Sequence, residues 1–344
     1  MIKYLIAISL FPNVVFANVA EDLRISGFGS ATTARSDSTT PVGQNRDLVD
    51  EWCFDCDTTL GIQFEWQISP GLRSAVQVIK RPQDHFSDPK LERAFVEYLT
   101  NNFKFKLGRL RTPLFIMSEY YYVSGAYPWL HLPNEVYDSS LGVTHYEGIG
   151  IDWSYETQRF GQFVLSPYYS RPVEEKIDQF GQRFHIRLTD GFGLAGNWYI
   201  EDNQVHAAIV HVDVEQTFAN SLRRDLSFNI FSTGFSYTYN NWHLQSELLL
   251  TENLHSNWYA SADYNWQAFT PYVVYGQSRR RRDTESYTLG INYAVAYNIS
   301  LYAEWQRIEG RPELISGQFT MPQDPSAPFD TDVNVLSLGL SLTF

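Results

Sequence analysis

Apolar and polar residues alternate one by one along many short stretches of this chain. The clearest stretch places Leu60, Ile62, Phe64, Trp66 and Ile68 on one face, with Gly61, Gln63, Glu65 and Gln67 between them. The stretches 149–156 and 287–295 repeat the pattern, and the chain ends with it at 335–344. Because successive side chains of a strand point to opposite faces, each stretch predicts a strand with one apolar and one polar face.

The alternation predicts an all-β fold of about 16 strands. They fall at 23–34, 57–68, 71–80, 91–99, 103–109, 147–156, 161–170, 191–200, 204–213, 227–239, 242–252, 256–266, 269–278, 284–295, 298–308 and 331–344. Short turns alternate with longer links, and the longest link is 110–146. An even strand number with short turns at one end and long loops at the other is typical of bacterial outer-membrane barrels. Because every backbone polar group must be paired in hydrocarbon, we expect a closed transmembrane antiparallel β-barrel.

Aromatic residues are placed as such a barrel requires. Tyr, Phe and Trp make up 16% of the chain, while its mean hydropathy is negative. Six aromatic residues lie beside predicted short turns: Trp66, Tyr98, Tyr155, Tyr239, Trp242 and Trp266. Their rings combine an apolar body with a polar atom, which favours the boundary between lipid tails and headgroups.

The N-terminus predicts export. Lys3 precedes a short apolar run at 4–10, and the small residue Ala17 offers a cleavage site. Such a run is too short to span a bilayer as a helix, so we expect residues 1–17 to be a cleaved signal peptide. Residues 18–344 then form a single barrel domain. A net charge of −13 argues against nucleic acid as a partner.

Two cysteines, Cys53 and Cys56, lie in one short segment of the first long link. In the oxidising periplasm a disulfide between them is the favoured interpretation. A thioredoxin-like redox site would need a βαβ setting that the strand pattern lacks. Zinc would need two further ligands, and the histidines show no metal-ligand spacing, so no metal site is expected.

In its final strand and in two further stretches, the chain resembles the general Gram-negative porin family. Leu340, Leu342 and the terminal Phe344 match the family's last strand, 23–30 its first strand, and 105–109 the strand before its long third loop. The resemblance implies a homotrimeric, water-filled channel for passive diffusion of small hydrophilic solutes, without catalytic residues or a cofactor. It also implies that Phe344 is read by the barrel-insertion machinery of the Gram-negative outer membrane.

The link 110–146 is the candidate constriction of this channel. A link of this length in a compact protein is usually functional, and its many aromatic residues predict that it packs rather than moves in water. In the porin family the third loop folds into the barrel. In this chain the link 110–146 carries the acidic residues Glu119, Glu135 and Asp138. The segment 111–115 departs from the sequence of enterobacterial porins, which leaves the constriction residues open. The alternative is a cap over the extracellular mouth.

Basic residues on the predicted polar faces would line the opposite wall. By parity, Arg73, Arg93, Lys104 and Lys106 face the lumen, whereas Arg109 does so only if a bulge resets the register. A basic wall facing an acidic loop would produce a transverse field across the constriction. The alternative is that each of these basic side chains is simply hydrated in a wide lumen.

Two other functions remain open from the sequence. One is an outer-membrane barrel enzyme, such as a phospholipase, with Ser, His and a carboxylate or amide on separate strands. The other is a barrel that sheathes an electron-transfer partner. Lipopolysaccharide is an expected contact of the outer surface. The small residues Gly27, Gly29 and Ala31 on the face of Leu23 and Ile25 are a weak hint of close contact within a trimer.

Overall fold

The computed structural model describes residues 22–43, 46–81, 89–138, 144–179, 182–217, 223–252, 255–280, 283–311, 317–320 and 329–344. The expected signal peptide, residues 1–17, lies outside these ranges. The strands are β1 (Leu23–Ser36), β2 (Thr59–Ser69), β3 (Leu72–Lys80), β4 (Lys90–Leu99), β5 (Phe103–Arg111), β6 (His145–Thr157), β7 (Gly161–Ser170), β8 (Val173–Gln179), β9 (Gln182–Ile200), β10 (Asn203–Thr217), β11 (Arg223–Tyr239), β12 (Trp242–Thr251), β13 (His255–Tyr264), β14 (Phe269–Arg280), β15 (Thr284–Ala296), β16 (Ile299–Gly310) and β17 (Asp332–Thr343). The link 112–144 is here called loop 3, and its described residues contain three short helices, η2 (Ser118–Tyr120), η3 (Ser124–Ala126) and α1 (Asn134–Tyr137).

Among the described residues, no helix is both long enough and apolar enough to cross a bilayer.

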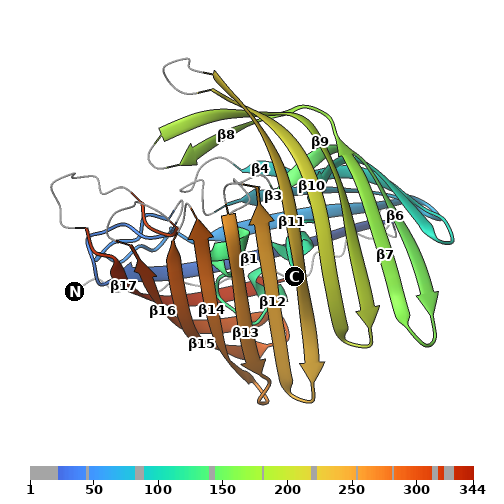
Figure 1. Cartoon of the computed structure of the whole chain (residues 1–344). Coiled ribbons are helices and arrows are strands. Elements are labelled where there is room, and N and C mark those ends of the chain that lie inside the picture. The colour runs from blue at the N-terminus through green and yellow to red at the C-terminus, as the bar shows by residue number, and fades with distance from the viewer. Residues whose placement is uncertain are drawn as a thin grey trace, which may run out of the picture.

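The strands form one closed antiparallel barrel (Figure 1). The strand β1 pairs with both β2 and β17, so the first and last strands complete the ring. Both β7 and β8 pair with β9, β7 along 191–199 and β8 along 182–188. Because β8 continues the position of β7, the 17 strands occupy 16 positions around the barrel.

The segment 171–190 corrects one sequence prediction. We expected a loop there, but the structure forms β8 and extends β9 beyond the end of β7. The many charged residues of this segment hide the apolar face by which the other strands are recognised. Without β8, the extended part of β9 would present unpaired backbone groups on that side.

The two faces of the barrel differ as the alternation predicts. On β2, Leu60, Phe64 and Trp66 are exposed on the outer face, whereas the alternate side chains point into the lumen. The six aromatic residues beside the short turns are all exposed, at fractions from 50% to 63%. Apolar side chains therefore cover the surface that would contact lipid, with aromatic rings toward the short-turn end.

Loop 3 lies inside the barrel, where its short helices are visible behind the front strands in Figure 1. Trp129, Val136 and Tyr137 are completely buried, in one cluster with residues of β3 to β7, β9, β10 and β12 to β14. The helix α1 contacts β12, β13 and β14, and η3 contacts β1 and β17. This position rules out the alternative in which the link caps the extracellular mouth.

Candidate channel constriction

Loop 3 is fixed to the barrel wall by buried polar groups. Nε2 of His206 on β10 donates to the carbonyl oxygen of Leu114 at 3.0 Å. The carboxylate of Glu247 on β12 accepts a hydrogen bond from the backbone N–H of Ile116 at 2.8 Å and another from the Tyr137 hydroxyl. Because Ile116 and Tyr137 lie near the two ends of the described part of loop 3, one carboxylate anchors both ends.

Glu135 is a second anchor, which corrects its expected role as a constriction acid. Its side chain is 2% exposed and accepts hydrogen bonds from the Ser286 hydroxyl at 2.5 Å and the Gln318 amide at 2.7 Å. The backbone oxygen of Glu135 also accepts from Asn257 at 2.7 Å. Burial raises the pKa of the Glu135 carboxyl above its ordinary value. The sequence places this acid in the right loop, but the first turn of α1 points it into the wall.

Glu119 is the acid of loop 3 that remains accessible. About 47% of its side chain is exposed, and Oε2 lies 2.9 Å from Nη2 of Arg93 on β4. The Arg93 guanidinium also lies over the ring of Phe95, 5.1 Å from its centroid. This ion pair joins η2 of loop 3 to the inner wall of the barrel.

The inner wall is not a uniformly basic surface, because Arg73 and Lys106 have carboxylate partners on neighbouring strands and Arg93 has one on loop 3. Nε of Arg73 lies 2.6 Å from Glu97, and Nη1 lies 3.8 Å from Glu65. Nζ of Lys106 lies 2.6 Å from Asp152 on β6. Lys104, which pairs in register with Asp152, is the wall cation without an ion-pair partner in the described part of the chain. Paired charges largely cancel at a distance, so the expected field between a basic wall and an acidic loop is weak.

Arg109 does not belong to this wall. The register shows no bulge between β4, β5 and β6, so Arg109 lies on the same outer face as Leu107, which is 62% exposed. There the Arg109 guanidinium contacts Glu147, and the other carboxylate oxygen of Glu147 contacts Arg171. The bulge that would turn Arg109 into the lumen is therefore absent from the pairing of these strands.

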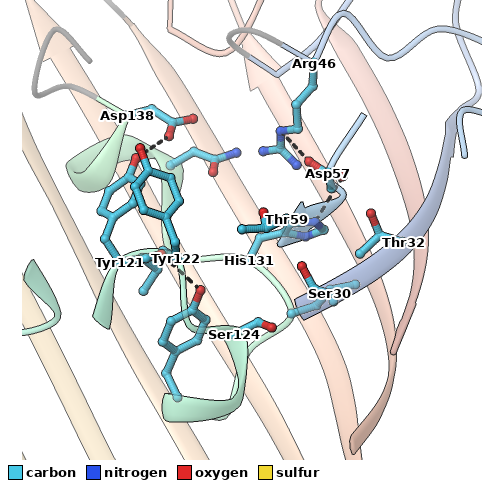
Figure 2. A pocket seen from close by; sticks show the side chains of 14 residues that line it. Ser30, Thr32, Arg46, Asp57, Thr59, Tyr121, Tyr122, Ser124, His131 and Asp138 are labelled. Carbon is cyan, nitrogen blue, oxygen red and sulfur yellow. Dashed lines mark hydrogen bonds and ion pairs between the residues drawn. The ribbon is translucent and has the colours of Figure 1, made fainter. Parts of the chain in front are cut away.

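Asp138, the third predicted acid, lines a polar cavity between loop 3 and the start of the barrel. Oδ1 of Asp138 lies 3.4 Å from the Tyr121 hydroxyl, which donates to it. Figure 2 shows Arg46 and His131 across this cavity from Tyr121 and Asp138. The cavity therefore combines charges of both signs with hydroxyl groups.

One side of this cavity is closed by a chain of ionic contacts, here called the clasp: Arg46, Asp57, His131 and Glu304. The His131 ring lies between two carboxylates, with Nε2 3.1 Å from Asp57 and Nδ1 2.8 Å from Glu304. Burial alone would lower the pKa of His131, but these carboxylates raise it to about 9. Burial would raise the pKa of Asp57, yet Arg46, 3.4 Å away, and His131 lower it to about 2. The clasp ties the first long loop to loop 3 and to β16.

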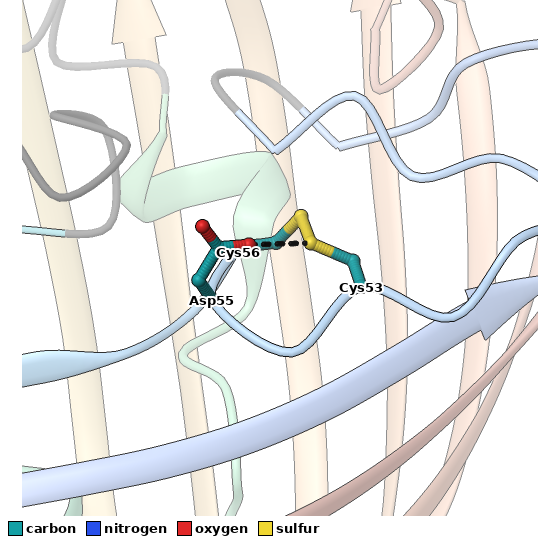
Figure 3. Close-up of side chains that lie close together, drawn as sticks. All are labelled: Cys53, Asp55 and Cys56. Atoms are coloured by element: carbon teal, nitrogen blue, oxygen red, sulfur yellow. Dashed lines mark hydrogen bonds between the residues drawn. A yellow bond between two sulfur atoms is a disulfide. The ribbon is translucent and has the colours of Figure 1, made fainter.

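A disulfide joins Cys53 and Cys56 just before Asp57 (Figure 3). The Asp55 carboxylate lies beside these sulfurs, 3.2 Å from Sγ of Cys53. Cysteine binds a metal ion as a free thiolate. Because both sulfurs are in the disulfide, Cys53, Asp55 and Cys56 form a poor metal site although their ligand atoms lie close together. The cross-link instead constrains the turn that positions Asp57 in the clasp.

Sequence reasoning missed the carboxylates Glu65 and Asp152 and the four residues of the clasp. The first two could have been found, because the alternation already places Glu65 with Arg73 and Asp152 with Lys106 on the lumen face. The clasp could not, since Asp57 and His131 lie in separate loops without a local pattern.

Comparisons with known proteins agree with this architecture. The sequence model of the Gram-negative porin family matches residues 5–312. Among solved structures, the anion-selective porin from Comamonas acidovorans is 13% identical with a TM-score of 0.62, and the match covers 94% of this chain and 100% of that one. OmpF of Salmonella typhi in complex with daunomycin is 15% identical, with a TM-score of 0.61 and coverage of 94% and 97%. A loop L8 deletion mutant of the Vibrio cholerae outer membrane protein OmpT is 15% identical, with a TM-score of 0.58 and coverage of 94% and 100%. A search of curated proteins finds no significant match.

Since the family match spans most of the chain and the fold is a closed barrel, this protein belongs to the Gram-negative porin family and forms a diffusion channel in the outer membrane.

Proposed function

We propose that solutes cross the channel past the Glu119–Arg93 pair and along the charged inner wall of β3 to β6, and that this constriction is weakly ion-selective. The observation that carries the proposal is the pairing of its charges. The cations are Arg73, Arg93, Lys104 and Lys106, and the carboxylates are Glu65, Glu97, Asp152 and Glu119. Equal numbers of cations and carboxylates, with three of the four cations in close pairs, would orient dipolar solutes locally without excluding small ions of either sign.

The reversal potential tests this proposal. The purified protein in a planar bilayer should give ohmic steps, without added cofactor, and a reversal potential near zero in a KCl gradient. A potential close to the equilibrium value of either ion would contradict a balanced constriction. The same recordings test the channel itself, because a protein without a lumen would give no steps.

The functional assembly we propose is a homotrimer, which rests on membership of the porin family and not on the small residues of β1. The ring of Phe344 occupies the space beside Gly27, and a side-chain methyl of Leu60 lies beside Gly29. This small-residue face is thus partly filled by the chain itself. Native mass spectrometry in detergent should give three chains per particle, and monomers alone would refute the trimer.

We propose further that the exposed C-terminal Phe344 is recognised by the barrel-insertion machinery and that lipopolysaccharide binds the outer surface near the loops. The outward cluster of Arg109, Glu147 and Arg171 supports the second part, because two guanidinium groups share one carboxylate. The side chain of Arg171 is 70% exposed and could contact a lipid phosphate. Substituting Arg171→Ala should reduce the lipopolysaccharide that copurifies, and unchanged retention would contradict this contact.

The mature chain is proposed to begin at Asn18 after removal of residues 1–17. N-terminal sequencing of protein extracted from outer membranes should give Asn18 first. Recovery of Met1 in that fraction would refute cleavage.

A further inference from the structure

Three side chains on adjacent strands form a hydrogen-bonded relay on the lumen wall, outside the constriction. The hydroxyl of Ser236 on β11 lies 2.8 Å from Nε2 of His243 on β12. Nδ1 of the same ring lies 2.8 Å from Oδ2 of Asp263 on β13. From this arrangement we infer that Ser236 is an activated nucleophile that accepts acyl groups from small esters entering the channel.

The strand register explains how the three groups meet. His243 pairs directly with Asp263 and with Thr238, and Ser236 lies two positions before Thr238 on the same face. The neighbours Phe235 and Trp242 are exposed on the outer face, so the relay points into the lumen. It lies near the short turn between β11 and β12, at the end of the barrel opposite the long loops.

Burial divides the roles within the relay. Asp263 is 3% exposed, whereas Ser236 and the His243 ring are only partly buried. A shielded carboxylate fixes the ring with its proton on Nδ1, which leaves Nε2 free to accept the serine proton. Nucleophile and base therefore remain accessible from the lumen, while the residue that orients the base is protected.

The groups beside Ser236 include a donor for the charge that develops during acyl transfer. Gln204 on β10 pairs directly with Ser236 in the register. Its Nε2 donates to Asn197 at 2.9 Å and makes a longer contact of 3.4 Å to the Tyr199 hydroxyl. The longer contact is the weaker one, so this N–H can turn to an oxyanion next to Ser236 at small cost.

The reaction needs no further reagent than ester and water. Oγ of Ser236 attacks the ester carbonyl carbon while its proton passes to Nε2 of His243, and the carbonyl π electrons move onto oxygen. When the tetrahedral intermediate collapses, the bond to the alcohol oxygen breaks and the alcohol leaves with the proton from His243. Water then attacks the acyl-serine with His243 as base, which releases the carboxylic acid and restores Ser236.

His206, which also lies on the lumen side, lacks this combination of partners. His206 bonds to Asn197 and to a loop 3 carbonyl, and neither partner is a nucleophile. The relay is thus distinguishable from the general network of polar contacts along the wall.

The test uses the full protein in detergent with a fluorophosphonate probe and p-nitrophenyl acetate. We expect the probe to label Ser236, as mapped by peptide mass spectrometry, and ester hydrolysis above the detergent blank. Ser236→Ala should abolish labelling, and Asp263→Asn should reduce hydrolysis by at least about tenfold, because the ring loses its orientation. Ser337→Ala is the matched control, since Ser337 faces inward on β17, a strand not adjacent to the relay, and it should behave as the wild type.

Single-channel conductance separates this inference from the channel function. Ser236→Ala should keep its ohmic steps while losing labelling, which would support both. Wild-type hydrolysis by Ser236→Ala, or no labelling of Ser236 in a protein that conducts normally, would overturn the nucleophile and leave the channel intact.

Discussion

Removing the charge of Glu119 should make the channel prefer anions. This carboxylate is 47% exposed and neutralises Arg93 at 2.9 Å, so Glu119→Gln leaves an unpaired guanidinium at the constriction. A unit charge about 5 Å from a passing ion changes its energy by about 0.8 kcal/mol in a water-like dielectric. Screening at 0.1 M salt reduces this to about 0.5 kcal/mol.

The change acts with opposite sign on cations and anions, so their permeability ratio should shift by about 1 kcal/mol, or about fivefold. In a tenfold KCl gradient this moves the reversal potential by about 30 mV toward the chloride potential, on a scale of about 59 mV per decade. Planar-bilayer recordings at 0.1 M and 1 M salt would measure it, and the higher salt should diminish the shift.

Glu135→Gln is the matched control in the same loop. Glu135 is 2% exposed and its pKa is raised by burial, so the substitution removes little or no charge from the solute path. Its reversal potential should equal that of the wild type. An unchanged potential in Glu119→Gln, or an equal shift in Glu135→Gln, would refute our placement of the constriction.

Three further predictions concern the contacts that hold the loops and the chain end. The pKa of His131 is raised to about 9, so the clasp's contribution to stability, on the order of 3 kcal/mol, is complete below about pH 6.5 and lost as pH rises through about 9. Thermal melts from pH 6 to 10 should show a steeper loss for the wild type than for His131→Gln, and parallel curves would count against the clasp. Replacing Cys53 and Cys56 by Ser should destabilise the first long loop by about 2 kcal/mol, the value for a very short closed ring, while leaving conductance unchanged. Faster proteolysis of that loop would report the loss, and equal cleavage would contradict it. Gly27→Val should slow insertion into lipid vesicles, because a Cβ at Gly27 would lie 2.3 Å from the Phe344 ring; a wild-type rate would show that this ring moves freely.

The barrel could be predicted from the sequence because its cause is local. Each strand separates an apolar medium from an aqueous one, so the period of two appears within a few residues and needs no knowledge of partners. Where both media are aqueous, as we infer for β8 and the start of β9, the alternation fades and the prediction fails. The same reasoning placed Arg73, Arg93 and Lys106 on the inner face and left Arg109 on the outer one.

The candidate site was only partly predictable because its charges are set by neighbours across strands. Parity assigns a face to Lys106, but whether Asp152 lies beside it depends on the register between β5 and β6. That register is fixed by turns and by packing, which the sequence of one strand does not contain. Glu135 shows the same limit for a loop, because one short helix decides whether an acid faces water or the wall.

The part of the barrel wall that loop 3 covers can nevertheless be recognised in the sequence. A strand between lipid and a water-filled lumen should be polar at every second position, yet β12 contains three consecutive leucines, 248–250. The inward one, Leu249, is 1% exposed in the cluster that contains Phe115 and Trp129 of loop 3. On β10, Ala208 and Val210 interrupt the polar face in the same way and join the same cluster. Apolar residues on the lumen face therefore mark where a loop covers the wall, because only a covering loop removes the cost of exposing them to water. Applied to β10 and β12, this rule places loop 3 against that part of the wall, and the same cluster also includes Ala75 of β3 and Phe95 of β4.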